Sequence, residues 1–568
     1  MKSPGFGFLF VLLLASAAVM AFEVKQVSAS DSAGYIRFSE SVYYVSGQSV
    51  NGTHDNTHED DGTYHISRGE RTPVVPRSRY KGGYRLNVHY NFTTGGLKNN
   101  QIQKLEVLGQ AHTDKSSSEW DVYLLIYNFQ TASWDSIGSF YGTQSDTNIT
   151  WTYPTDSPNY TAPYVDDAGN MKLRWWFWVE DFSELWVDLQ YIKLTPRRWT
   201  FMVYMAADGL MEGAGNDTVN EMEEVGSTSG VAVLAQLDLY ATSGVKHYLV
   251  IKDNDTDNIT SPVLWSHDEL NMGDPLTLVD FVNHSIQSYP AEHYALILWN
   301  HGCGFRGVCY DKHPTDELNM TELKQALSKI KNDTGITFDL IGFDACLMGE
   351  LEVAYQIKNY GQVMVGHEET GHVTTWPYDG ILMNLTDNPT MSAIVLAKEI
   401  VTRYREYHLE KPGALPEATI SAVFLANITE LSQRASDLAT ALQQDLEEYR
   451  DSINGSRTQV QEYGVGACGP DFNASFVDVY HLAELLNQSI NNDMVKSLCQ
   501  QIKQAVNATI ISEWHRPNGP RPNSHGITIY FQDNKTSYEV DKDQYNSIDF
   551  AQEYQWDEFL KAYLGVEE

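Results

Sequence analysis

Basic residues are scarce in this chain of 568 residues. Lysine and arginine number 39 against 75 aspartate and glutamate residues, which gives a formal net charge of −36 at pH 7. A field of this sign repels nucleic acid and anionic lipid at long range, so neither is an expected partner. It concentrates cationic ligands, including peptides rich in lysine or arginine, although the same charge also serves solubility alone.

Long hydrophobic runs are missing after the N-terminus. The chain opens with one lysine and an almost unbroken apolar run over residues 5–22, which ends in Val19-Met20-Ala21. Such a run with small residues at its end is typical of a cleaved signal peptide. We therefore expect residues 1–21 to be removed and the protein to be secreted. A membrane or cell-surface location is the alternative if the run stays uncleaved.

Glycosylation sequons support export independently. Seventeen Asn-x-Ser/Thr sequons occur between Asn51 and Asn534. An abundance of Asn and Thr on a polar surface accounts for only some of them. The sequence therefore predicts an extracellular glycoprotein.

Cysteine is also scarce, and its count is odd. The simplest pairing joins Cys303 to Cys309 and Cys468 to Cys499, which leaves Cys346 free. Sequence alone does not fix this connectivity, but an odd count in an oxidising compartment leaves at least one thiol unpaired. An unpaired thiol in a secreted protein calls for a functional reason.

The first part of the chain holds aromatic-rich, alternating runs such as YRLNVHYNF and EWDVYLLIYNF, up to about Leu194. Runs of this kind, separated by Gly, Asn, Asp and Pro, are typical of antiparallel strands. We predict an all-β, sandwich-like domain over residues 22–195. The charged stretch HDNTHEDDG at residues 54–62 is predicted to be a loop and not a metal site.

After Pro196 the pattern changes to short continuous apolar runs that alternate with amphipathic stretches. This pattern predicts a doubly wound, mostly parallel α/β domain over residues 196–380. Residues 381–568 are predicted to be α-rich, and they either complete that domain or pack on it. The predicted strands are residues 200–205, 231–238, 293–300, 338–343, 362–365 and 526–531, and the predicted helices are 320–331, 347–358, 390–407, 428–453 and 477–489.

A histidine and a cysteine each follow directly after a predicted strand. His301 ends the run YALILWNH, and Cys346 ends the run FDLIGFDAC. Taken singly, each is more often structural, the cysteine as a small buried hydrophobe. Because the carboxyl ends of neighbouring parallel strands meet at the ligand-binding edge of a sheet, we expect the imidazole and the thiol to lie together.

The motifs around these two residues resemble those of the clostripain family of cysteine peptidases, which is grouped with caspases, legumains and gingipains. The motifs are WTFMVYMAAD at residues 199–208, NHG at 300–302, DACLM at 344–348, HEE at 367–369 and WPY at 376–378. The resemblance covers about residues 199–531. It implies a caspase-like fold and a secreted cysteine endopeptidase that hydrolyses protein or peptide substrates.

The resemblance also implies residue roles. Cys346 would attack the peptide carbonyl as a thiolate, while His301 handles the protons. The backbone N–H groups of Gly302 and Cys346 would hold the oxyanion. Asp344 matches the family position that faces the side chain before the cut, where a carboxylate selects Arg or Lys. A local salt bridge or a helix cap is the alternative role for Asp344.

Other family properties leave positions open. Members often use a second acid in the same pocket, and Glu368, Glu369 and Asp379 are the candidates here. The mechanism requires no cofactor, but some members depend on calcium, so a structural calcium ion is compatible with the sequence at a site that it does not identify. Many members are also cut after a basic residue between the histidine and the nucleophile. The possible positions here are Lys312, Lys324, Lys329 and Lys331, of which Lys312 lies in the expected loop.

Three other stretches of the sequence suggest competing interpretations. HEETGH at residues 367–372 suggests a zinc peptidase, but histidines at i and i+5 point apart on a helix. DNDTDN at residues 253–258 resembles the start of a calcium loop but lacks its glycine and closing acid. The non-enzyme alternative is an extracellular carbohydrate- or surface-binding protein with an inactive peptidase-like domain, in which RWWFWVEDF lines a sugar cleft.

Overall fold

The computed structural model describes residues 35–566, except for residues 38–40, 47, 52–64, 69, 73–82, 95–101, 118–120, 154–162, 167, 180–183, 240–243, 372–375, 411–414, 465–467 and 469–475. The expected signal peptide and the charged stretch at residues 54–62 lie outside the described residues. Within the described part of the chain, no helix is both long and apolar enough to span a bilayer.

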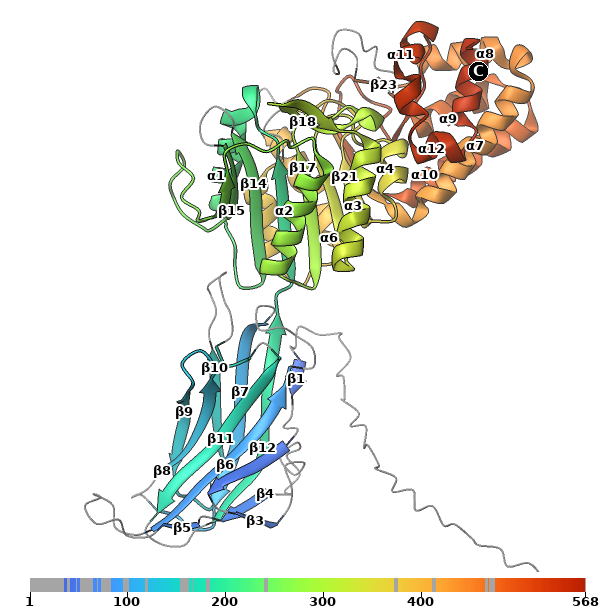
Figure 1. Cartoon of the computed structure of the whole chain (residues 1–568). Coiled ribbons are helices and arrows are strands. Elements are labelled where there is room, and N and C mark those ends of the chain that lie inside the picture. Colours follow the sequence, from blue (N-terminus) through green and yellow to red (C-terminus); the bar gives the residue numbers. More distant parts are fainter. Residues whose placement is uncertain are drawn as a thin grey trace, which may run out of the picture.

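The N-terminal region is a β-sandwich (Figure 1). Two six-stranded antiparallel sheets share one apolar core. Along β11 (Asn170–Val179), Leu173, Trp175 and Phe177 are buried, whereas the intervening Arg174 and Trp176 are half-buried, as the alternation of a strand requires. The predicted all-β sandwich is therefore confirmed.

The two sheets of the sandwich have simple orders. One runs β10-β7-β12-β4-β3 with β1 beside β12, and the other runs β2-β6-β11-β8-β9 with β5 beside β6. The remaining strands are β1 Tyr35–Arg37, β2 Ser41–Ser46, β3 Gln48–Asn51, β4 His65–Arg68, β5 Glu70–Thr72, β6 Gly83–Thr93, β7 Ile102–Thr113, β8 Asp121–Asn128, β9 Ser133–Tyr141, β10 Thr147–Tyr153 and β12 Glu184–Pro196.

A nine-stranded sheet forms the centre of the second region, in the order β16-β15-β14-β13-β17-β20-β21-β22-β25. The five strands from β14 to β21 run parallel, and the flanking strands are antiparallel. One apolar cluster joins the sheet to α2, α3 and α4, and a second joins it to α1, α5 and α6. Helices therefore cover both faces, which confirms the doubly wound, mostly parallel fold.

These elements lie close to the predicted ranges. The strands are β13 Trp199–Met205, β14 Val231–Leu239, β15 Gly244–Leu249, β16 Val263–His267, β17 His293–Trp299, β20 Phe338–Asp344, β21 Gly361–Gly366, β22 Thr419–Phe424 and β25 Ile510–His515, with a hairpin of β18 Val308–Lys312 and β19 Thr315–Leu318. The helices are α1 Glu212–Glu223, α2 Pro275–Ser288, α3 Met320–Thr334, α4 Leu351–Ile357, α5 Tyr378–Asp387 and α6 Ala393–Glu410.

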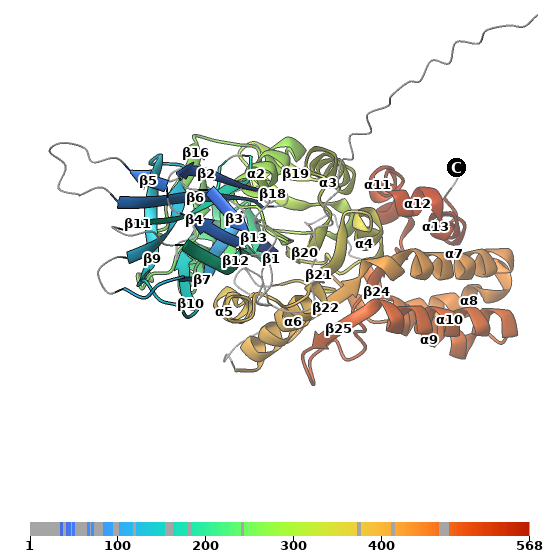
Figure 2. The same ribbon diagram turned by 90° about the horizontal axis from the view of Figure 1, so that it is seen from below.

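The C-terminal part both completes the sheet and packs beside it. Its strands β22 and β25 extend the sheet past β21. Beyond this edge α7 to α10 lie side by side (Figure 2). The elements are α7 Ile428–Gln444, α8 Leu446–Gln459, β23 Glu462–Tyr463, β24 Phe476–Asp478, α9 Val479–Ser489, α10 Asp493–Thr509, β26 Thr528–Tyr530, α11 Lys535–Tyr545, α12 Asp549–Glu553 and α13 Trp556–Leu564.

Two predicted helices differ from the observed ones. The helix predicted over residues 428–453 is interrupted at Asp445, whose φ of −121° lies outside the helical range. The helix predicted over residues 347–358 begins only at Leu351. Leu347 has φ of +63°, a left-handed conformation that no helix contains, so a turn separates Cys346 from α4.

Candidate active site

Strand register brings His301 and Cys346 to the same edge of the sheet. β17 and β20 are parallel neighbours, and Trp299 pairs with Asp344 at their carboxyl ends. His301 and Cys346 each stand two residues beyond that pair, so they leave adjacent strands at the same height. The two backbones are in close contact, because a Cβ added to Gly302 would lie 2.5 Å from the carbonyl oxygen of Cys346. A side chain at position 302 would separate the two loops.

Hydrogen bonds fix the turn that carries Cys346. The N–H of Leu347 donates to the carbonyl of Glu369 at 3.3 Å, and the N–H of Gly349 donates to the carbonyl of His367 at 2.7 Å. Both acceptors follow β21, the next parallel strand. The left-handed Leu347 costs conformational energy, and these bonds hold it in place.

The Cys346 thiol is half-buried and uncharged at neutral pH. Burial, reinforced by the charges of Glu369 and Asp344, raises its pKa, while the N–H of Gly371 opposes this by donating to Sγ at 3.2 Å. A thiol in such surroundings is a poor nucleophile until a base removes its proton. The site therefore needs its histidine as a base.

His301 has the properties of that base. Its side chain is exposed, but the surrounding protein still desolvates the ring and lowers its pKa. Within the described part of the chain, no carboxylate hydrogen-bonds to the ring. At neutral pH the resting pair is therefore a thiol and a neutral imidazole.

The N–H group of Gly302, directly after His301, is not used in the backbone pairing of residues 301–303 with residues 307–309. Cys309 donates to the carbonyl of His301 at 3.2 Å, and Cys303 donates to the carbonyl of Gly307 at 3.0 Å. These bonds flank the Gly302–Val308 bridge and use neither N–H of that pair. The N–H of Gly302 thus stays outside the ladder, next to the Cys346 backbone.

Asp344 lies among two further acids. It is 8% exposed and accepts a hydrogen bond from the Tyr378 hydroxyl at 3.1 Å. Glu221 on α1 lies close by, because burial, Asp379 and Asp344 together raise the pKa of Glu221 to about 9. The sequence contains no signal for Glu221, which lies far from the strand-end motifs along the chain.

The three acids left open by the sequence have different partners. Glu369 forms an ion pair with Arg521 at 2.5 Å. Glu368 is fully buried, and burial together with Asp478 raises its pKa well above the usual range. Asp379 alone belongs to the group with Asp344 and Glu221.

The predicted disulfide pairing is wrong. Cys303 is bonded to Cys468, 165 residues away, with a Cα–Cα distance of 5.9 Å. Cys309 and Cys499 are free, buried and packed in the apolar core, where burial raises the pKa of Cys499 to about 12. Cys346 is free as expected. Spacing along the chain cannot show that the loops of Cys303 and Cys468 meet in space.

The two metal motifs rejected from the sequence have other roles. The buried His367 ring accepts from the Trp376 indole at 2.9 Å and lies 2.6 Å from the carbonyl of Thr419, so both nitrogens are used. His372 lies outside the described residues. Asp255 caps a surface turn by accepting the N–H groups of Asp257 and Asn258.

The lysines between the dyad residues fall into two groups. Lys324 and Lys329 lie on α3 and form ion pairs with Asp549 and Asp333. Lys331 on the same helix donates to the carbonyl of Asn359 at 2.8 Å. Lys312 is exposed at the end of β18, next to the hairpin turn.

Residues 203–563 match the Clostripain family, Peptidase C11. Among curated proteins, the chain is 26% identical over 349 residues to Clostripain of Hathewaya histolytica. That match covers 50% of this chain and 63% of the relative, so the chain spans less than two thirds of the length of the relative.

Solved structures of related proteins are also similar. One is an inactive zymogen C11 protease from Parabacteroides distasonis, with 19% identity, 63% of this chain and 97% of that chain covered, and a TM-score of 0.48. Another is a secreted C11 cysteine protease from Bacteroides thetaiotaomicron in complex with an irreversible peptide inhibitor. It has 19% identity, 64% and 99% coverage, and a TM-score of 0.49.

Proposed function

Because the chain belongs to the clostripain family, we propose that it is a cysteine endopeptidase whose dyad is Cys346 and His301. The observation that carries this proposal is the register of β17 and β20, which places both residues two positions beyond the Trp299–Asp344 pair. An unpaired, half-buried thiol and a neutral imidazole that follow adjacent strands suit acyl transfer.

The chemistry follows from the resting protonation states. His301 takes the thiol proton as Cys346 attacks the peptide carbonyl, and the imidazolium then gives that proton to the departing amine. The resulting thioester is hydrolysed by water, with His301 again as the base. The N–H groups of Gly302 and Cys346 stabilise the oxyanion, and each such donor lowers the barrier by about 2.7–4 kcal/mol.

Cleavage after Arg or Lys is the proposed specificity. Asp344 lies near the Cys346 thiol and forms a group of three carboxyl groups with Glu221 and Asp379. A guanidinium or ammonium group would relieve their mutual repulsion and find a ready hydrogen-bond acceptor. A neutral side chain would leave the acids uncompensated, so the pocket discriminates by charge.

Secretion, glycosylation and the domain division also belong to the proposal. The N-terminal apolar run and the sequons support export. In the proposed division, residues 22–195 form an accessory domain, 196–380 the catalytic domain and 381–568 the part that completes it. N-terminal sequencing of secreted protein should start at Phe22, and a start at Met1 would contradict cleavage.

The test compares release of a fluorophore from matched peptides ending in Arg, Lys, Asp, Asn or Leu under reducing conditions. The Cys346→Ala variant should lose more than about 10,000-fold in rate, because it removes the covalent route. Cys499→Ala is the matched control, since it removes a free thiol buried on α10, and it should keep its activity.

Each result has a clear meaning. Cleavage after Arg or Lys that vanishes only in Cys346→Ala supports the dyad and the pocket. Cleavage after another residue keeps Cys346 as the nucleophile and discards the basic pocket. No cleavage, even after pretreatment with trypsin and addition of calcium, would favour the carbohydrate- or surface-binding alternative. That result would then call for a test of polysaccharide binding by the whole chain.

A further inference from the structure

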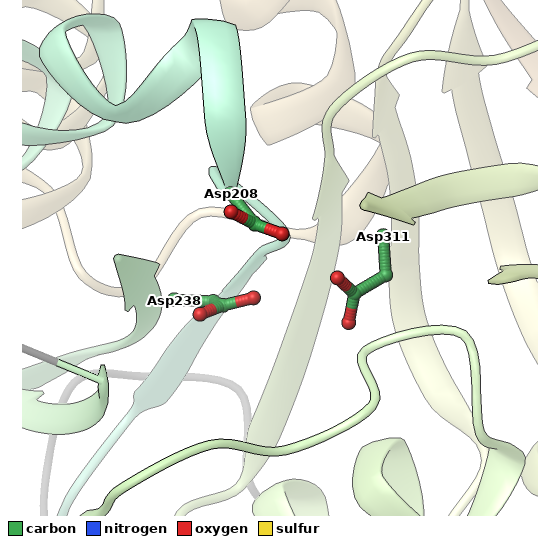
Figure 3. A group of neighbouring side chains, drawn as sticks. All are labelled: Asp208, Asp238 and Asp311. Carbon is green, nitrogen blue, oxygen red and sulfur yellow. The ribbon is translucent and has the colours of Figure 1, made fainter. Parts of the chain in front are cut away.

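Three aspartates from separate segments meet outside the proposed active site. Asp208 follows β13, Asp238 lies near the end of β14, and Asp311 lies on β18. Each offers an oxygen atom, and these atoms all lie within 4.8 Å of one another. Figure 3 shows the three carboxylates facing a common space.

Their charges are poorly compensated by protein groups. Asp238 is 0% exposed, and neither of its carboxylate oxygens has a hydrogen-bond partner. Asp208 is bonded through one oxygen to His313 Nδ1 at 2.8 Å, and its other oxygen is buried without a partner. Within the described residues, no lysine or arginine forms an ion pair with any of the three. Bare carboxylates in such a place cost several kcal/mol of desolvation.

The third aspartate and a neighbouring glutamate add to the negative charge. Asp311 accepts the N–H of Met272 at 2.6 Å and the N–H of His313 at 3.0 Å, which fixes its carboxylate toward the cluster. Glu269 lies close enough for the charges of Asp311 and Asp208 to raise its pKa, after burial as the largest cause. Asp238 also lies near the charges of Glu269, Asp311 and Asp208, so four acids gather at this place.

We propose that Asp208, Asp238 and Asp311 bind one calcium ion. Calcium takes six to eight oxygen ligands at about 2.3–2.6 Å, so two ligands on opposite sides lie up to about 5 Å apart. The aspartate oxygens all lie within 4.8 Å of one another, which is compatible with that span. Magnesium usually keeps several waters and is held by one or two carboxylates, so a site of three protein carboxylates favours calcium.

The ion would join the sheet to the loop of His301. It links the ends of β13 and β14 to the β18–β19 hairpin, and Cys309 of that hairpin donates to the carbonyl of His301. Asp311 stands two residues after Cys309. Loss of the ion would therefore loosen the support of His301 without removing any group that touches substrate.

The test uses the full chain with Cys346→Ala, which prevents self-digestion and makes binding independent of peptidase activity. After treatment with EDTA, calcium chloride is titrated in a calorimeter, and thermal unfolding is recorded with and without millimolar calcium. One site per chain is expected, with magnesium bound at least about tenfold more weakly. Calcium should raise the unfolding temperature by on the order of 5 °C.

Asp238→Asn should reverse this pattern. In EDTA the variant should unfold at a higher temperature than its parent, because an amide relieves the repulsion within this group of buried acids. Addition of calcium should not raise the unfolding temperature of this variant. Asp255→Asn is the matched control, because it removes an exposed acid from the DNDTDN turn and should respond to calcium as the parent does.

Two results would overturn the proposal. One is a parent protein that shows neither binding heat nor a shift in unfolding temperature with calcium, which decides the matter even if Asp238→Asn does not fold. The other is equal stabilisation of the parent and Asp238→Asn. A response lost only in Asp255→Asn would place the ion in the surface turn and would also overturn the assignment.

Discussion

Two groups of carboxylates lie at the carboxyl ends of one parallel sheet, and their surroundings differ. Asp344 ends β20 and shares its group with the half-buried Glu221 and Asp379. The other group, after β13 and β14, consists of aspartates that are all buried. In our proposals, the first group binds the cationic side chain of a substrate and the second binds a resident calcium ion. Access to solvent makes the difference.

The largest expected effect is a loss of activity on Arg peptides when the Asp344 group is changed but not when the Asp238 group is changed. Asp344→Asn should lower kcat/KM for Arg peptides by about 100-fold, because it removes a charge-assisted hydrogen bond, and should spare Leu peptides. Asp238→Asn should leave the ratio of Arg to Leu cleavage unchanged. If Asp344→Asn slows cleavage of both peptides equally, Asp344 supports the dyad and does not form the specificity pocket.

A smaller effect is expected from Glu221, which belongs to the group of carboxylates around Asp344. Glu221→Gln should lower kcat/KM for Arg peptides by about tenfold, since a bound guanidinium lowers the raised pKa of Glu221 and so creates a second negative charge near Asp344. Parallel assays with Arg and Lys peptides measure this. An unchanged Arg rate would show that Glu221 holds its proton throughout and contributes no charge.

Alkylation by iodoacetamide should report the smallest effect. Since the pKa of Cys346 is raised above its ordinary value, the thiol is mostly un-ionised at pH 7, and the alkylation rate should keep rising on the alkaline side of neutrality. Asp344→Asn should shift this profile to lower pH, because Asp344 is one of the charges that raise the pKa of Cys346. Asp238→Asn should not shift it. A plateau reached by pH 7 would reveal a preformed thiolate–imidazolium pair.

Self-cleavage can be followed in the same preparations. Lys312 is exposed beside the hairpin turn, and it directly follows Asp311 of the proposed ion site. A chain break there should disappear in Cys346→Ala. A break that persists in that variant would come from another protease.

Strong local patterns predicted much of the architecture. The central strands are continuous apolar runs, so β13, β17 and β20 lie within a residue or two of their predicted ranges. Strands β22 and β25 and the break at Asp445 were not predicted, because they depend on pairing and packing with distant segments. The role of the N-terminal sandwich stays a prediction.

The sequence by itself determined the parallel strands of the sheet, the helices on both faces and the placement of His301 and Cys346 directly after two strands. Apolar runs of a few residues form the buried parallel strands, and the residues that follow each run lie at the carboxyl end of its strand. Both features can be read from the local sequence pattern. Only the tertiary structure decided which groups meet across long separations. The Cys303–Cys468 bond, the place of Glu221 beside Asp344 and the meeting of Asp208, Asp238 and Asp311 all depend on how separate segments approach in space. No local signal encodes that approach, because it results from packing of the whole core.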